Sequence, residues 1–419
     1  MQCIAFGPGR YSLGVVCNRL AGLLLVCLVL ACAPDQRPTV PPRATTPAYG
    51  ETPMNPATIA SGQQIFRFDS YGDESYWTDT LRMHEVIASS VSPATALAVG
   101  LKVDMDALPP AVVQAIQQGK VDLNSPATTV ALLKLGAVVG INGSVDANNR
   151  LTSVGITCAL CHSTVDNAFA PGIGHRLDAW PNRDLNVGAI VALSPNVPTS
   201  LKAILNTWGP GKYDPRINID GKNTPLVIPP AFGMRHVARE TYTADGVVSY
   251  WNDYVAVTQM HGHGSFSDPR IGVNINNPPD LVSAKLEALR AYQFSLEKPQ
   301  PQSGQVDASS AKRGKAVFMG AGGCASCHYG VALSDINSGV LHSPTEVGQD
   351  PAYALRTATK LYRTTPLRGL WNPPQLRGPY FHDGSAATLE QVVDHYIGVF
   401  HLALSAQQKS DLVAYLKTL

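Results

Sequence analysis

The sequence predicts a mainly α-helical protein built from two small domains joined by long irregular segments. Three observations lead to this fold class. Apolar residues recur at the spacing of one helix face near the C-terminus, over residues 406–419. One five-residue motif, C-x-x-C-H, occurs once in each predicted domain, at residues 158–162 and 324–328. The 419 residues include 36 glycines and 32 prolines and are only 15% charged, which is typical of a globular chain rich in loops.

The first 31 residues are predicted to be a signal peptide. Arg10 and Arg19 stand before or at the start of an apolar run that reaches Ala31. The run is too short to span a bilayer but suits the apolar core of a signal peptide. It ends in L-V-L-A-C, which resembles a bacterial lipoprotein cleavage site with Cys32 as the lipidated residue. The alternative is an ordinary signal peptide with a nearby cysteine.

Residues 32–57 contain seven prolines, so they are predicted to form an extended tether. A tether that follows a lipidated cysteine holds a folded body close to a membrane surface. The predicted location is therefore the periplasm, with membrane attachment only through Cys32.

Both C-x-x-C-H motifs predict covalent attachment of heme c, so two heme c groups are expected. In this motif the two cysteines form thioethers to the porphyrin, and the adjacent histidine ligates the iron. The other four cysteines lie within the first 32 residues, which leaves none in the body for disulfides. A zinc or thiol-redox site needs further ligands at matched spacing, and none is nearby. The attaching cysteines are Cys158, Cys161, Cys324 and Cys327, and the proximal iron ligands are His162 and His328.

Residues 58–300 are predicted to form the N-terminal heme domain. Its motif begins only at Cys158, so we expect a domain enlarged by insertions. The segment G-Q-Q-I-F-R at residues 62–67 resembles the start of a cytochrome helix, and a second helical pattern around residues 80–90 carries His84 as a packed or surface residue. Residues 206–280 are rich in Gly, Pro and Asn and are expected to be irregular.

A polar linker at residues 301–309 is predicted to lead into a C-terminal domain at residues 310–419. Residues 311–318 are predicted to form a helix before the second motif, and residues 406–416 a closing helix. This arrangement resembles class I cytochrome c, in which the first and last helices cross beside the heme.

Another helix is predicted to start after Thr388, with Gln391 at the third helical position to complete a capping box. Tyr396 lies on its apolar face and His395 at the edge of that face. Because no methionine follows Met319, the usual methionine ligand of a carrier cytochrome is missing. The candidates for the sixth position of the second heme are Tyr396, His395, His342, His382 and His401, and Tyr396 as a core aromatic is the alternative.

Three further motifs carry a family resemblance. They are T-P-L-R-G-L at residues 365–370, G-P-Y-F-H-D-G-S at 378–385 and T-L-E at 388–390. Together they resemble the C-terminal domain of bacterial di-heme cytochrome c peroxidases and their tryptophylquinone-forming relatives. The peroxidases place an axial Met at the position of Tyr396, and the quinone-forming relatives place a Tyr there. The resemblance therefore implies Tyr396 as the sixth ligand, with His395 as second choice.

The segment P-G-I-G-H at residues 171–175 resembles the part of these peroxidases whose His closes the low-potential heme at rest. This resemblance implies His175 as the sixth ligand of the first heme. Met260, His261 and His263 are rivals, and a solvent-facing loop histidine is the alternative reading of His175.

Cleavage of hydrogen peroxide needs an open iron site and a group that moves a proton between the two oxygens. The resembling peroxidases use a Glu on a segment after the first heme, and no residue here matches that Glu convincingly. Glu240, His261 and His263 are the candidate catalytic residues, and Asp253 is a further possibility.

These observations predict an exported di-heme c-type cytochrome, a peroxidase-like oxidoreductase that reduces hydrogen peroxide or a related small oxidant. Its partner would be a small redox protein that donates or accepts electrons. The alternative is a non-catalytic electron carrier of a periplasmic respiratory chain, and a heme-based sensory lipoprotein is a third hypothesis. The formal charge of +1 argues against nucleic-acid binding.

Overall fold

The structure is a computed structural model that describes residues 54–301, 304–371, 373–376 and 378–419. The predicted leader, most of the tether and Cys32 lie outside these described residues. Helices dominate, and the strands of the described part pair only in two-stranded sheets, which confirms the mainly α class. No helix in the described ranges is both long enough and apolar enough to cross a membrane.

The predicted N-terminal domain is framed by its first and last helices, α1 (Pro56–Phe68) and α11 (Leu286–Ser295), which pack against each other. Gly62 stands at their crossing, where an added Cβ would lie 1.9 Å from the carbonyl oxygen of Ala288. One turn later, the rings of Phe66 and Tyr292 meet edge to face at 5.5 Å. The predicted cytochrome helix at residues 62–67 is therefore present, and its partner lies more than two hundred residues away in sequence.

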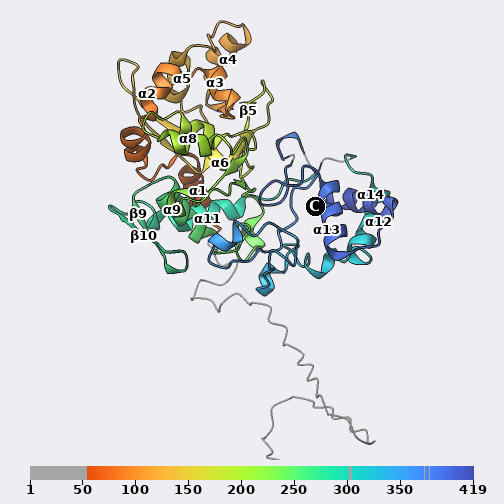
Figure 1. The fold of residues 1–419 in the computed structure, drawn as a ribbon. Coiled ribbons are helices and arrows are strands. Elements are labelled where there is room, and N and C mark those ends of the chain that lie inside the picture. The colour runs from red at the N-terminus through yellow and green to blue at the C-terminus, as the bar shows by residue number, and fades with distance from the viewer. Residues whose placement is uncertain (1–53, 302–303, 372, 377) are drawn as a thin grey trace, which may run out of the picture. The chain divides into compact units, whose positions relative to one another are not determined.

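The second domain repeats this arrangement with α12 (Ala308–Met319) and α14 (Ala406–Leu416). An added Cβ on Gly314 would lie 1.8 Å from the carbonyl oxygen of Asp411, and the rings of Phe318 and Tyr415 meet edge to face at 5.2 Å. Helix α13 (Leu389–Phe400) packs beside α14 (Figure 1). Both domains thus share a G-x-x-x-F first helix and a Tyr on the closing helix.

A long insertion separates α1 from the first heme motif. Its helices start where the sequence supplies helix-initiating residues, such as Ser92, whose hydroxyl caps Thr95, and Pro93 at the first helical position. Its apolar side chains form the largest hydrophobic core of the first domain, which includes Trp77 and Leu133. The elements are η1 (Ser75–Thr80), α2 (Met83–Ser90), α3 (Pro93–Ala98), β1 (Val103–Asp104), η2 (Met105–Ala107), α4 (Pro110–Gln117), α5 (Pro126–Lys134), β2 (Ile141–Val145) and β3 (Leu151–Ile156).

The chain between the first motif and α11 contains short elements. β4 pairs with β6, β7 with β8 and β9 with β10, all antiparallel, while β5 pairs with β1 in parallel. The elements are α6 (Ala159–His162), β4 (Ser163–Val165), β5 (Ile173–Gly174), β6 (Arg176–Asp178), α7 (Val187–Ala192), α8 (Thr199–Leu205), β7 (Lys212–Tyr213), α9 (Ile217–Asp220), β8 (Leu226–Val227), η3 (Met234–His236), α10 (Val248–Tyr254), η4 (Val255–Gln259), β9 (Gly264–Asp268), η5 (Pro269–Ile271), β10 (Val273–Asn277) and η6 (Ser283–Lys285).

The expectation of irregular chain over residues 206–280 is wrong for its second half. Helix α10 and the β9–β10 hairpin fill that part, because Trp251, Tyr254 and Phe266 pack into one buried aromatic cluster. Tertiary burial here overrides the local Gly and Asn content.

Irregular chain with four short 3-10 turns links α12 to α13. The turns are η7 (Cys324–Ser326), η8 (Asp335–Ser338), η9 (Ala354–Arg356) and η10 (Pro374–Leu376). The capping box expected at Thr388 forms only in part. The Thr388 hydroxyl accepts from the backbone N–H of Gln391, but the Gln391 side chain accepts from Ala387 instead of Thr388.

Candidate heme sites

The first attachment motif follows strand β3 directly. The Asp73 carboxyl group, fully buried, receives the backbone N–H of Ile156 with both oxygens at 3.2 Å, which fixes the chain just before Cys158. Burial raises the pKa of Asp73 to about 9, and the nearby Glu74 and Asp69 add to this effect, against the hydrogen bond from Ile156. The carboxyl group is therefore protonated at neutral pH.

His162 closes this motif at the end of α6. Burial lowers the pKa of His162 to about 4, and the carbonyl of Pro229 partly opposes this shift. The imidazole is neutral at physiological pH, the form in which histidine ligates iron. Cys158 and Cys161 are partly buried and form no disulfide, so their sulfurs are free for thioether bonds. These residues fit a covalently attached heme c.

The second motif is held in a similar way. Gly323 precedes it with φ of +64°, a conformation that favours glycine, and turn η7 then brings Cys324 and Cys327 into one short loop. The Nδ1–H of His328 donates to the carbonyl of Leu333 at 2.9 Å. This bond leaves Nε2 as the free nitrogen and sets the tautomer that an iron ligand requires. These residues also fit heme c.

Tyr396 lies beside the second motif. Burial raises the pKa of Tyr396 to about 12, and Cys327 and Cys324 lie close enough to contribute to the shift. Its ring stacks on Phe400 at 5.8 Å, and within the described ranges its hydroxyl has no hydrogen-bond partner. The hydroxyl thus lies beside the second motif without a hydrogen-bond partner among the described residues. Its assignment as the sixth ligand stays a prediction.

The other candidates near the second motif make polar contacts of their own. His395 Nε2 lies 2.9 Å from the carbonyl of Val347. His342 stands between Asp335 and Glu346, each 2.9 Å away, and Asp335 is the main cause that raises the pKa of His342 to about 11. His382 lies 3.0 Å from the Tyr362 hydroxyl, and His401 is the C-cap residue of α13.

His175 and its surroundings belong to the sheet that flanks the first motif. The backbone carbonyl of His175 accepts from Asp166, just beyond the β4–β6 pairing. Its side chain is 52% exposed and pairs with Asp106 at 2.9 Å, which raises the pKa of His175. Its predicted role as sixth ligand of the first heme stays a prediction.

The structure separates the three candidate catalytic residues. His261 and His263 lie on a segment that packs against Tyr71, which in turn contacts Cys158 of the first motif. The ring of His261 stacks on Tyr76 at 3.6 Å, and burial lowers the pKa of His261 to about 4. The Nδ1–H of His263 donates to the carbonyl of Pro278.

Glu240 occupies a different place from these histidines. Its Oε2 lies 3.1 Å from a guanidinium nitrogen of Arg363 and 3.4 Å from one of Arg368, and all three side chains are buried. Glu240 therefore pairs with the second domain instead of joining the His261 segment.

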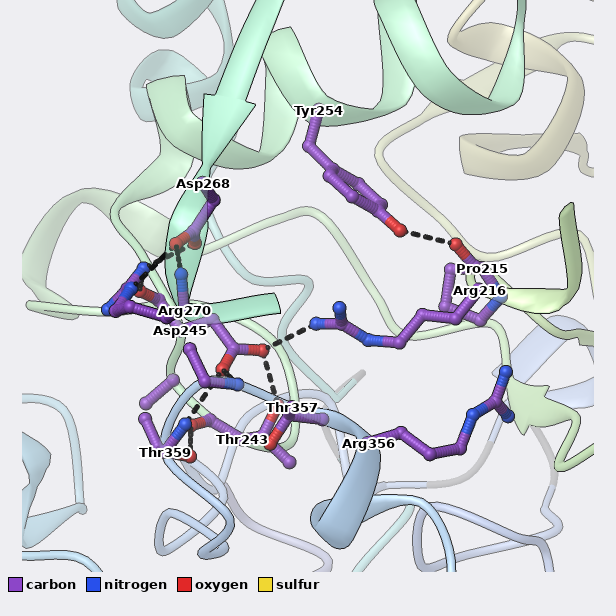
Figure 2. Close-up of polar contacts among 12 residues, drawn as sticks. Pro215, Arg216, Thr243, Asp245, Tyr254, Asp268, Arg270, Arg356, Thr357 and Thr359 are labelled. Carbon is purple, nitrogen blue, oxygen red and sulfur yellow. Dashed lines mark hydrogen bonds and ion pairs between the residues drawn. The ribbon is translucent and has the colours of Figure 1, made fainter. Parts of the chain in front are cut away.

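Sequence reasoning missed a set of buried polar residues. A buried network joins the two domains around Asp245, which accepts from Arg216 at 3.0 Å and from the backbone N–H of Ala358 at 2.9 Å (Figure 2). Beside it, Arg356 of the second domain pairs with Asp214 at 2.8 Å and Asp220 at 2.7 Å. Sequence analysis did not single out Arg216, because no local signal in the sequence marks its burial.

Comparison with known proteins assigns the C-terminal part of the chain to a family. The family described as Cytochrome c matches residues 311–419, so this segment is a cytochrome c domain. The methylamine utilization protein MauG of Methylorubrum extorquens is 32% identical over 158 residues, which cover 33% of this chain and 43% of MauG. The cytochrome-c peroxidase IdrP2 of Denitromonas iodatirespirans is 33% identical over 177 residues, covering 33% of this chain and 47% of the peroxidase.

The chain spans less than half the length of these relatives. The resemblance predicted from the C-terminal motifs is confirmed by them. Among solved structures, hydrazine synthase of Kuenenia stuttgartiensis under xenon pressure gives a TM-score of 0.33 at 22% identity, over 47% of this chain and 73% of its own. A MauG-like protein associated with microbial copper homeostasis gives 0.32 at 20% identity, over 47% and 74%.

Proposed function

We propose that this chain is an exported two-heme c-type cytochrome that acts as a peroxidase-like oxidoreductase. Its substrate would be hydrogen peroxide or a related small oxidant, and a small redox protein would supply the electrons. Heme c, when bound, supplies an iron that exchanges single electrons. The similarity to cytochrome-c peroxidases and to MauG supports this class of activity.

The single observation that carries the proposal is the place of Tyr396. A carrier cytochrome needs a sixth ligand that suits both iron charges, and Met serves that purpose. Tyr396 instead offers a phenol oxygen beside Cys324 and Cys327, and an anionic oxygen favours the ferric state. A site built in this way is suited to hold oxidising equivalents instead of passing electrons at high potential.

The His261 segment supports proton transfer at the first site. The imidazole of His261 is neutral above about pH 4 and has no hydrogen-bond partner among the described residues, so it can accept a proton from bound peroxide. Reduction of peroxide to two waters consumes two electrons from the redox partner and two protons. His261 would take the proton from the inner oxygen and return it to the outer oxygen.

Low-temperature electron paramagnetic resonance on the oxidised and half-reduced protein tests the proposal. We expect a high-spin ferric signal in at least one state, because an enzyme needs one iron that is open or weakly closed. Two hemes that stay low-spin until full reduction would overturn the proposal and favour the electron carrier.

A variant pair tests the role of His261. We expect His261→Gln to lower the kcat/KM for peroxide by about 100-fold, the usual size of an acid–base contribution. His263→Gln is the matched control, since its ring is bound to the Pro278 carbonyl. Equal activity of both variants and the parent would remove His261 from the mechanism.

The proposed periplasmic location with a lipid anchor rests on the sequence of residues 1–32 alone. Mass spectrometry of the N-terminal peptide, isolated from the native host, tests it. We expect a diacylglyceryl group on Cys32. We also expect the Cys32→Ser variant to be released from the membrane, because it lacks the thiol that carries the lipid. An unmodified N-terminus would leave an ordinary signal peptide.

A further inference from the structure

Arg183 is partly buried, and no acidic side chain among the described residues pairs with it. Its Nε and Nη1 atoms are buried and have no hydrogen-bond partner among the described residues. The adjacent acid, Asp184, is 70% exposed and pairs with Lys102 at 2.5 Å, so it does not neutralise Arg183. An unpaired buried charge costs several kcal/mol, and proteins that keep one provide a counter-charge. An anion is therefore expected to bind the Arg183 guanidinium in the folded protein.

The groups around Arg183 do not supply that anion. The ionisable side chains that act on it are Tyr242 and Tyr380, and burial raises the pKa of both, so both phenols are neutral at physiological pH. Tyr242 also lies near Arg363, whose backbone N–H donates to the Tyr242 carbonyl at 2.9 Å. Glu240 is shared between Arg363 and Arg368, so this neighbouring cluster is also positively charged.

The backbone ties Arg183 to the first heme motif. The N–H of Asn182 donates to the carbonyl of Cys161 at 2.9 Å, and the Asn182 side chain donates to the carbonyl of Gly100. On the other side, Gly211 packs so closely that an added Cβ would lie 2.7 Å from the Arg183 carbonyl oxygen. Arg183 thus directly follows Asn182, the residue that is hydrogen-bonded to the loop of the first C-x-x-C-H motif.

We infer that Arg183 binds a propionate of the heme attached at Cys158 and Cys161. Heme c brings two carboxylates into its pocket, and a guanidinium binds a carboxylate with two parallel hydrogen bonds. The inference rests on the first heme of the proposed function and not on any reaction with peroxide. It adds a residue that holds the heme by its carboxylate edge, apart from the cysteines and the histidine.

The same carboxylate chemistry could come from the second heme. Tyr380 and Cys324 pack against the same hydrophobic core, so a propionate from that side is the rival source. The first heme is favoured because Asn182, the neighbour of Arg183 in sequence, donates its backbone N–H to the carbonyl of Cys161. The experiment must therefore follow each heme separately.

The test compares Arg183→Gln and Arg183→Lys with the parent by spectroelectrochemical titration and resonance Raman spectroscopy. In Arg183→Gln we expect a lower midpoint potential of the first heme, because loss of a nearby positive charge stabilises ferric iron. We also expect a shift of the propionate bending band in the Raman spectrum. Arg183→Lys should restore the potential in large part but not the Raman band, since an ammonium cannot form the paired contact.

Two controls make the outcome readable. Tyr396→Met changes the second heme pocket and so identifies the titration step of the second heme, and Arg150→Gln removes an exposed arginine that pairs with Asp146. A heme count on the parent comes first, because a single heme would contradict the proposed function itself. With two hemes present, an unchanged first step and unchanged Raman bands in Arg183→Gln would overturn the inference. A shift confined to the second heme would overturn the assignment to the first.

Discussion

Beside the two C-x-x-C-H motifs, burial is the main cause that raises the pKa values of two residues, Tyr396 and Asp73. The Tyr396 phenol oxygen lies next to the cysteines of the second motif and has no hydrogen-bond partner among the described residues. Asp73 keeps a proton next to the first motif. In both cases the low-polarity surroundings disfavour the ionised form. A bound iron would therefore favour loss of the Tyr396 proton, and a rise in pH toward about 9 would remove the Asp73 proton.

Replacement of Tyr396 tests whether its oxygen reaches the iron. We expect Tyr396→Phe to change the ferric absorption and paramagnetic resonance spectra of the second heme, because a phenolate ligand contributes its own charge-transfer band. Tyr415→Phe is the matched control, since Tyr415 packs edge to face on Phe318 in the helix crossing. If both variants keep the parent spectra, Tyr396 is a core aromatic.

Asp73 gives stability a defined dependence on pH. Its pKa is raised in the folded state, so its contribution is fully present below the unfolded pKa near 4 and is lost as pH rises through about 9. Unfolding free energies measured from pH 5 to 8 should fall with a slope of up to about 1.4 kcal/mol per pH unit from this group. Asp73→Asn should remove that component, and an unchanged slope would contradict the protonated state.

At the scale of elements, the same helix crossing frames each of the two predicted domains. Gly62 and Gly314 let the first helix approach the last closely, and Phe66 and Phe318 each meet a Tyr on the closing helix. The second crossing was predictable, because its helices lie close in sequence and their apolar stripes are clear. The first was not, since nothing local in residues 286–295 marks that helix as the partner of α1.

Substitution at the crossing should destabilise the domain. Gly314→Ala places a Cβ against the Asp411 carbonyl, so we expect a loss of about 1–3 kcal/mol in unfolding free energy. Gly398→Ala is a matched control, because Gly398 lies in α13 with no atom within 4 Å of its added Cβ. That control should be neutral or stabilise by up to about 1 kcal/mol. Equal effects in denaturant titrations would refute the close crossing.

At the scale of the whole molecule, buried ion pairs join the cytochrome c segment to the chain that precedes it. Arg356, Arg363 and Arg368 come from the second domain, while their acids Asp214, Asp220 and Glu240 come from the first. The two C-x-x-C-H motifs predict two heme attachments, because the cysteines and the histidine of one attachment are neighbours in sequence. They could not predict these pairs or Arg183, because each acid and base lies far apart in sequence and only the folded chain brings them together or keeps them apart.

Removal of one partner should therefore weaken the whole fold. Arg356→Gln leaves the fully buried Asp214 without its cation, and we expect a loss of about 3–5 kcal/mol in unfolding free energy. Arg82→Gln is the control, since Arg82 and Glu85 form an exposed pair that contributes less than about 1 kcal/mol. A small effect of Arg356→Gln in chemical denaturation would mean that the domains do not depend on this contact.

The insertion between α1 and the first heme motif also bears on the order of folding. Gln63 of α1 and Tyr292 of α11 are 229 residues apart, whereas Arg313 and Asp411, which join α12 to α14, are 98 apart. Closing the longer loop costs only about 0.8 kcal/mol more in chain entropy, but it delays a contact that cannot form until residue 292 has been synthesised. The first C-x-x-C-H loop is thus synthesised long before α11 is available to pack against α1, whereas α14 follows the second loop sooner.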